Sequence, residues 1–226
     1  MATDASVPAP DGTSIPIALA APDALGPAVV IVPAILGVTD EIRTRLDEYA
    51  AAGVLAAALD PFHRVDPGPV GPDELPRAMA RAKATDPDGC YGDLSSLIDH
   101  VRRQPGCNGK LVAVGICFGG RYAWRAAADG RVDGAATWHG GGIGELAHLA
   151  ERIRCPLSLQ FGGADSSIPV EEVDRIRAAL QGHGNVEIAL HPGAQHGFTH
   201  RGAPMFDEAA NAAAENGVRT ILAGLR

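Results

Sequence analysis

The chain has 226 residues, of which 46% are hydrophobic and 20% charged, and its formal net charge is −8 at pH 7. This length suits one full α/β domain and is short for two, so we expect a single domain over 1–226 with a loose arm at about 1–10. The acidic balance argues against nucleic acid or an anionic membrane as partner, and no run approaches the ~18 apolar residues of a membrane span.

Apolar runs bounded by turn residues predict strands, and apolar residues at helical spacing predict helices. Pro16 would confine the first strand to a sheet edge. The expected strands are 14–20, 28–32, 54–59, 111–116, 132–138, 156–161 and 185–190, and the expected helices are about 40–52, 74–83, 93–103, 121–128, 170–180 and 204–222. This alternation predicts an α/β fold with a mostly parallel central sheet and helices on both faces.

The central feature is a Gly-x-Cys-x-Gly-Gly turn at 115–120, between a buried strand and a helix. This is the context of a nucleophile elbow, with Cys117 where the motif usually has serine. The glycines let backbones approach closely around a strained nucleophile, and the helix N-terminus favours thiolate. The alternative is that Cys117 is a buried structural thiol, because free cysteine is among the most buried residue types.

Asp165 and His196 follow later predicted strands, so that nucleophile, acid and histidine occur in the chain order of α/β-hydrolases. Cys117 would attack a carbonyl carbon, His196 would move the proton, and Asp165 would orient the imidazole. The backbone N–H groups of Phe118 and Ile35 would hold the oxyanion. Taken singly, Asp165 could be a helix N-cap and His196 a surface histidine, but all three follow strands in the right order.

The four cysteines, at 90, 107, 117 and 155, have neither C-x-x-C spacing nor a disulfide-dense pattern. Reduced thiols are the simplest account. The first residues show no basic region followed by an apolar stretch. We therefore expect a cytoplasmic protein.

With these motifs the chain resembles the dienelactone hydrolases (carboxymethylenebutenolidases), cysteine members of the α/β-hydrolase fold. The resemblance covers about residues 10–222. It rests on Gln104-Pro105, Asn108-Gly109-Lys110, Val114 to Gly120, Gly162-Gly163-Ala164-Asp165 with Pro169, and Gly193 to Phe198; Leu36-Gly37-Val38 and Leu59-Asp60-Pro61 also fit. It implies hydrolysis of a cyclic enol-lactone that bears a carboxylate, with no metal and no organic cofactor.

Two features depart from the family pattern. The best-known members carry a glutamate that hydrogen-bonds the resting thiol, where this chain has Ala34. They also grip the substrate carboxylate with two arginines: here His200 and Arg201 are candidates for one, and Arg77 and Arg81 for the other. Arg77 and Arg81 could equally be a charged pair on a solvated helix face.

Trp138 and His139 end the strand after the elbow and would line the pocket, although a packing role for Trp138 is equally credible. The sequence predicts a cysteine hydrolase of a small lactone or ester, with no oligomeric state indicated and a monomer plausible. One alternative is an esterase or thioesterase for another activated acyl substrate. Another is a non-catalytic small-molecule binding protein on the same fold.

Overall fold

The computed structural model describes residues 1–226 and divides them into two compact units. The N-terminal unit is Met1–Leu111 with Arg226, and the C-terminal unit is Val112–Leu225, so that the boundary falls inside strand β5 (Cys107–Ile116). Eight strands form one mixed, mostly parallel sheet flanked by helices. The predicted fold class is confirmed.

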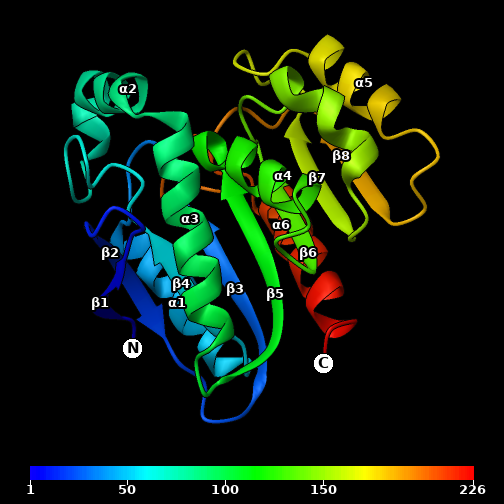
Figure 1. The fold of residues 1–226 in the computed structure, drawn as a ribbon. Coiled ribbons are helices and arrows are strands. Elements are labelled where there is room, and N and C mark those ends of the chain that lie inside the picture. Colours follow the sequence, from blue (N-terminus) through cyan, green and yellow to red (C-terminus); the bar gives the residue numbers. More distant parts are fainter. The chain divides into compact units, whose positions relative to one another are not determined.

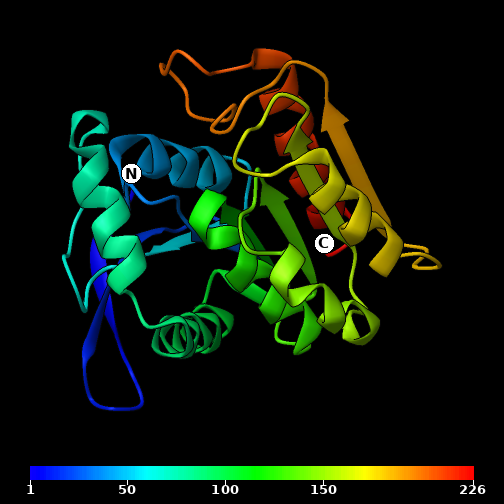
Figure 2. The same ribbon diagram turned by 90° about the horizontal axis from the view of Figure 1, so that it is seen from above.

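In the N-terminal unit, neighbouring strands follow the order β1, β2, β4, β3, and only β3 and β4 pair in parallel. Every residue of β3 and β4 is buried, as their apolar sequences predict. Helices α1 and α3 cover opposite faces of these strands (Figures 1 and 2). The bounds are β1 Thr3–Pro8, β2 Ser14–Ala20, β3 Gly26–Val32, β4 Leu55–Leu59, α1 Asp40–Ala51, η1 Pro72–Glu74, α2 Leu75–Ala84 and α3 Pro87–Arg102.

The structure corrects two expectations here. The segment expected as a loose arm contains β1, which pairs antiparallel with β2 through its backbone while Val7 alone has a buried side chain. Strand β2 lies between β1 and β4 and is not an edge strand. Pro16 is tolerated because the ladder to β4 begins at Ile17, so no bond of that ladder needs the missing N–H.

In the C-terminal unit, β5, β6, β7 and β8 are parallel neighbours in that order. Helices α4 and α6 pack on opposite faces of β6, with α6 in red in Figure 1. The bounds are η2 Cys117–Gly119, α4 Gly120–Ala128, β6 Gly134–Trp138, η3 Gly144–Arg152, β7 Leu157–Gly162, α5 Val170–Ala179, β8 Val186–His191 and α6 Glu208–Ala223.

Aspartate caps set two helix starts that apolar spacing missed. Asp86 accepts from the N–H groups of Asp88 and Gly89, so α3 begins before the predicted 93. Asp207 accepts from Ala210 N, so α6 begins after the predicted 204. The short helix η3 was not predicted.

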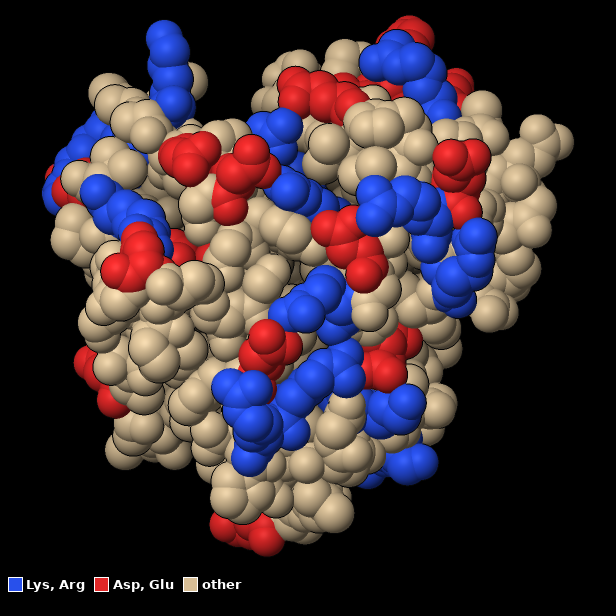
Figure 3. Space-filling view, viewed as in Figure 1, with Lys and Arg blue, Asp and Glu red and all other residues tan.

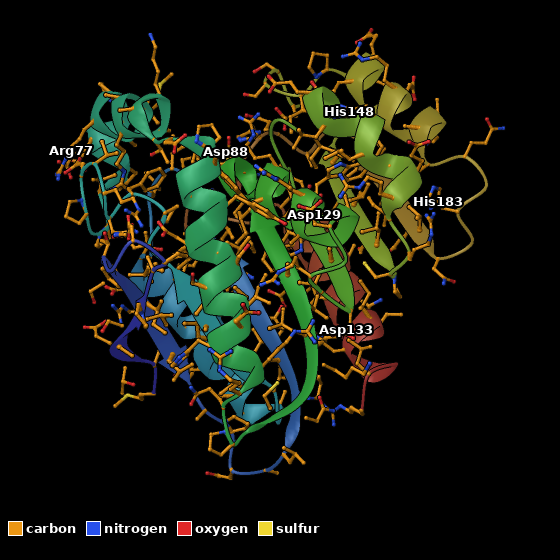
Figure 4. All side chains as sticks on the ribbon, viewed as in Figure 1. Arg77, Asp88, Asp129, Asp133, His148 and His183 are labelled. Atoms are coloured by element: carbon orange, nitrogen blue, oxygen red, sulfur yellow. The ribbon has the colours of Figure 1, made fainter.

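Charged side chains of both signs lie next to one another over much of the face in Figure 3. Asp129, labelled in Figure 4, forms one such pair with Arg152 at 2.7 Å. Exposed pairs of this kind contribute little to stability. None of the helices combines the length and the apolar character that crossing a membrane would need.

Candidate active site

Cys117 follows β5 and has a φ of 50°, in the left-handed region that residues other than glycine rarely adopt. The backbone around it is crowded: a Cβ on Gly115 would lie 2.4 Å from the carbonyl oxygen of Gly119. A Cβ on Gly120 would lie 2.4 Å from the Cα of Gly140. The close approach of neighbouring backbone atoms therefore requires glycine at positions 115 and 120. The turn between them holds Cys117 in a strained conformation.

The structure brings Cys117, His196 and Asp165 together within the C-terminal unit. The Sγ of Cys117 lies 3.1 Å from Nε2 of His196, and Nδ1 of the same ring lies 2.7 Å from Oδ2 of Asp165. The three residues come from the segments that follow β5, β8 and β7. In a parallel sheet these segments meet at one edge, where functional residues of α/β proteins gather.

Asp165 has two sets of partners. Its Oδ1 accepts hydrogen bonds from the backbone N–H groups of Ser167 at 2.7 Å and Ile168 at 3.1 Å. The N-cap of α5 is Pro169, so Asp165 fixes the turn before that helix and is not the helix cap. Because the turn holds one oxygen, the other stays directed at His196.

His196 is electrostatically perturbed. Burial alone would lower its pKa, but the hydrogen bonds with Asp165 and Cys117 outweigh burial and raise the pKa to about 10. A charged imidazole is therefore favoured at neutral pH. A proton held at this position lies within reach of the sulfur and of any leaving group beside it.

His139 lies against the same histidine and is completely buried. Its ring centroid is 4.8 Å from that of His196, in an edge-on arrangement, and its φ is 39°. Its Nε2 lies 2.9 Å from Oγ1 of Thr199, a buried residue that sequence reasoning missed. Only the position of Thr199 shortly after His196 could have pointed to it. His200 also packs on His139, at 5.4 Å between ring centroids.

Trp138 is fully buried, and its indole N–H donates to the carbonyl oxygen of Ala214 in α6 at 3.2 Å. These contacts agree with a packing role. A contact between Trp138 and substrate stays a prediction.

Each candidate arginine has partners within its own unit. Arg77 points outward from α2 and pairs with Asp66 at 2.7 Å and Glu74 at 2.9 Å (Figure 4). Arg201 pairs with Glu215 at 2.6 Å.

Arg81 is 2% exposed, so it is not a surface residue of the basic helix. Its Nη2 donates to the carbonyl oxygen of Ile35 at 2.7 Å and its Nη1 to that of Gly68 at 2.6 Å. The guanidinium also stacks over the ring of Phe62, 4.2 Å from its centroid. Through these hydrogen bonds, Arg81 connects α2 to the segments around Ile35 and Gly68.

The two residues predicted to supply the oxyanion hole belong to different units. Phe118 follows Cys117 directly in η2, and Ile35 lies between β3 and α1. The role of their N–H groups stays a prediction. Two further histidines, His148 on η3 and His183 after α5, are labelled in Figure 4 and are not members of the cluster of Cys117, His139 and His196.

A cysteine at a strained strand-to-helix turn, with a histidine and an aspartate after later strands of a mostly parallel sheet, defines the α/β-hydrolase class. The comparisons agree. The chain matches the model of the dienelactone hydrolase family over residues 15–224. It is 31% identical, over 222 residues and 92% of each chain, to an Azospirillum brasilense protein assigned as a carboxymethylenebutenolidase.

A carboxymethylenebutenolidase of Pseudomonas putida is 28% identical over 204 residues, which are 88% of this chain and 86% of that protein. The crystal structure of a Klebsiella pneumoniae protein assigned as a dienelactone hydrolase superposes with a TM-score of 0.87 at 26% identity, covering 99% of this chain and 98% of that one. The chain belongs to the dienelactone hydrolase family, as its motifs indicated, and it is a hydrolase that acts on ester bonds.

Proposed function

We propose that this hydrolase cleaves a small lactone or ester through a thioester intermediate on Cys117. The observation that carries the proposal is the unbroken line of contacts from the Cys117 sulfur through His196 to Asp165, at 3.1 Å and 2.7 Å. Nucleophile, proton carrier and orienting carboxylate are the parts that acyl transfer needs.

The reaction follows from these positions. With the shared proton on His196, the Cys117 sulfur attacks the carbonyl carbon of the substrate. His196 then gives that proton to the alkoxide oxygen as the C–O bond breaks, and the acyl group remains as a thioester. Neutral His196 next takes a proton from a water molecule whose oxygen attacks the thioester carbon. Expulsion of the sulfur releases the acid and restores the starting pair.

Negative charge on the carbonyl oxygen rises in both steps and needs hydrogen-bond donors. We assign that role to the backbone N–H groups of Phe118 and Ile35, on the family pattern of one donor after the nucleophile and one in an early loop. The bonds from Arg81 to the Ile35 carbonyl fix the orientation of the peptide that follows Ile35, which supports an ordered loop in this region.

A second candidate is an esterase or thioesterase for an uncharged acyl group. The observation that favours it is that Arg77, Arg81 and Arg201 are all engaged with other groups of the chain. Ala34, in place of the glutamate expected from the family, points the same way. The predictions that the protein is cytoplasmic, acts without a cofactor and has neither nucleic acid nor a membrane as partner belong to this proposal too.

The test is pre-steady-state hydrolysis of p-nitrophenyl acetate. We expect a burst of nitrophenolate stoichiometric with enzyme, and an acetylated Cys117 in the quenched protein by mass spectrometry. Cys117→Ala should show neither. A burst that persists in Cys117→Ala would place the acyl group elsewhere, and a wild-type protein that binds esters without turnover would indicate a binding protein. A panel of anionic lactones and neutral aryl esters then separates the two substrate classes.

A further inference from the structure

Three groups that bind soft metal ions converge beside the nucleophile. The Cys117 sulfur and one ring nitrogen each of His139 and His196 all lie within 4.8 Å of one another. All three residues belong to the C-terminal unit. Thiolate and imidazole are the preferred ligands of Zn²⁺, with metal distances of about 2.3 Å to sulfur and 2.0–2.1 Å to nitrogen.

The separations suit a metal ion with little rearrangement. In a tetrahedral site with those bond lengths the ligand atoms lie roughly 3.3–3.6 Å apart. Cys117 and His196 already approach to 3.1 Å, and the largest separation in the group is 4.8 Å. A shift of the His139 side chain by about 1 Å would complete a three-ligand site with its fourth position open.

The outer contacts also match those of protein zinc sites. Metal-bound histidines almost always engage their second ring nitrogen with a carboxylate or another polar group, which fixes the ring. Here Nδ1 of His196 is held by Asp165 at 2.7 Å, and Nε2 of His139 is held by Thr199 at 2.9 Å. Both rings are therefore oriented before any ion arrives.

We infer that Cys117, His139 and His196 form a Zn²⁺ site that overlaps the catalytic centre and inhibits hydrolysis when it is filled. The ligands would be Sγ of Cys117, Nε2 of His196 and Nδ1 of His139, the nitrogen opposite the Thr199 contact. The proton shared by Cys117 and His196 leaves to solvent as the ion binds, so the sulfur loses its role as nucleophile and His196 its role as proton carrier. Access is through Cys117 and His196, which are partly exposed.

The test measures zinc inhibition of p-nitrophenyl acetate hydrolysis at buffered free Zn²⁺, with reversal by a chelator. Inhibition of each variant is compared with its own zinc-free rate. His139→Asn removes the imidazole ligand while keeping a side chain that tolerates a positive φ. It should weaken inhibition at least ~10-fold, since even changes outside the ligand set cost 10–100-fold in affinity. The matched control is His200→Asn, which alters the other histidine that packs on His139 but no ligand; its inhibition constant should match the wild type.

X-ray absorption at the zinc edge of the wild-type complex tests the same assignment without a variant. We expect one sulfur and two imidazole nitrogens around one zinc per chain. Equal inhibition of wild type and His139→Asn, or a zinc with a single imidazole ligand, would overturn the three-residue site. Zinc that leaves the rate unchanged would also overturn it. These results leave the proposed hydrolysis untouched, because that activity is judged from the zinc-free rate, which is measured separately for each protein.

Discussion

Gly141 donates its backbone N–H to the carbonyl oxygen of Cys117 at 2.8 Å. This bond connects the loop after β6 to the strained turn at Cys117. The same two segments also meet at Gly120 and Gly140, where a Cβ on Gly120 would lie 2.4 Å from the Cα of Gly140. The position of the sulfur is therefore set by its own turn and also by the neighbouring loop that carries His139.

Gly120→Ala should accordingly damage both stability and catalysis. Its Cβ would lie 2.4 Å from the Cα of Gly140, which is backbone and must move. We expect a loss of about 1–3 kcal/mol in unfolding free energy, as for overpacked sites. Displacement of the elbow should lower kcat by up to ~100-fold. Urea denaturation and ester hydrolysis measure the two effects.

The control is Gly92→Ala in α3, where a Cβ meets no atom within 4 Å. Replacing an unconstrained helical glycine should stabilise the fold by roughly 0.5–1 kcal/mol and leave kcat unchanged. If Gly120→Ala behaves like this control, the contact between the two glycine segments is not tight in solution.

Cys117 should be the cysteine that reacts first with iodoacetamide near neutral pH. The charged imidazole of His196 lies beside its sulfur, whereas burial raises the pKa of Cys155 to about 11. Cys90 and Cys107 are buried. Peptide mapping should find one modified cysteine, and activity should fall in proportion to its modification.

Cys155→Ser serves as the matched control and should keep the wild-type rates of labelling and inactivation. Activity lost through a label on Cys155, Cys90 or Cys107, with Cys117 unmodified, would contradict the assignment of the nucleophile.

Structural features that depend on side chains could be predicted from the sequence, whereas features that depend on backbone hydrogen bonds could not. Buried strands such as β3 were predictable because burial on both faces demands an unbroken apolar run. Strand β1 was not, because it joins the sheet by backbone hydrogen bonds with Val7 as its one buried side chain. Arg81 looked like a surface residue because the carbonyl groups that bind its guanidinium leave no mark in the sequence.

The candidate site shows the same limit. The order of Cys117, Asp165 and His196 could be read from motifs, since each follows a strand whose end lies at one edge of the sheet. The contact between His139 and Thr199 joins residues 60 positions apart and involves no motif. Sequence placed His139 at a strand end but could not say that its side chain turns inward.

Arg201→Gln should change the hydrolysis of anionic and neutral esters by the same factor. Its guanidinium is already paired with Glu215 at 2.6 Å, and Arg219 pairs with the same carboxylate at 2.6 Å. A charge that is neutralised in this way gives little to a substrate carboxylate. The measurement is kcat/KM for p-nitrophenyl acetate and for the p-nitrophenyl monoester of succinate, with Arg77→Gln as the exposed control. A tenfold loss of kcat/KM confined to the anionic ester, worth about 1.4 kcal/mol, would instead show that Arg201 binds the substrate carboxylate.

The pKa of His196 should make stability depend on pH in one particular window. Its folded pKa of about 10 lies above the ordinary value of 6.5, so the proton stabilises the folded state. That contribution is fully present below about pH 6.5 and is lost as the pH rises through about 10.

Asp165→Asn removes the charge that favours the proton, while the amide oxygen can still accept from Ser167 and Ile168. We expect the variant to be less stable than the wild type by about 1.5–3 kcal/mol near pH 7, the range for a hydrogen bond to a charged group. The difference should shrink between pH 7 and 10, because the wild type alone loses a stabilising proton there. Urea denaturation across this range, with His183→Gln as an ordinary histidine control, measures it. A difference that stays constant up to pH 10 would show that Asp165 supports His196 by packing and orientation and not by holding its charge.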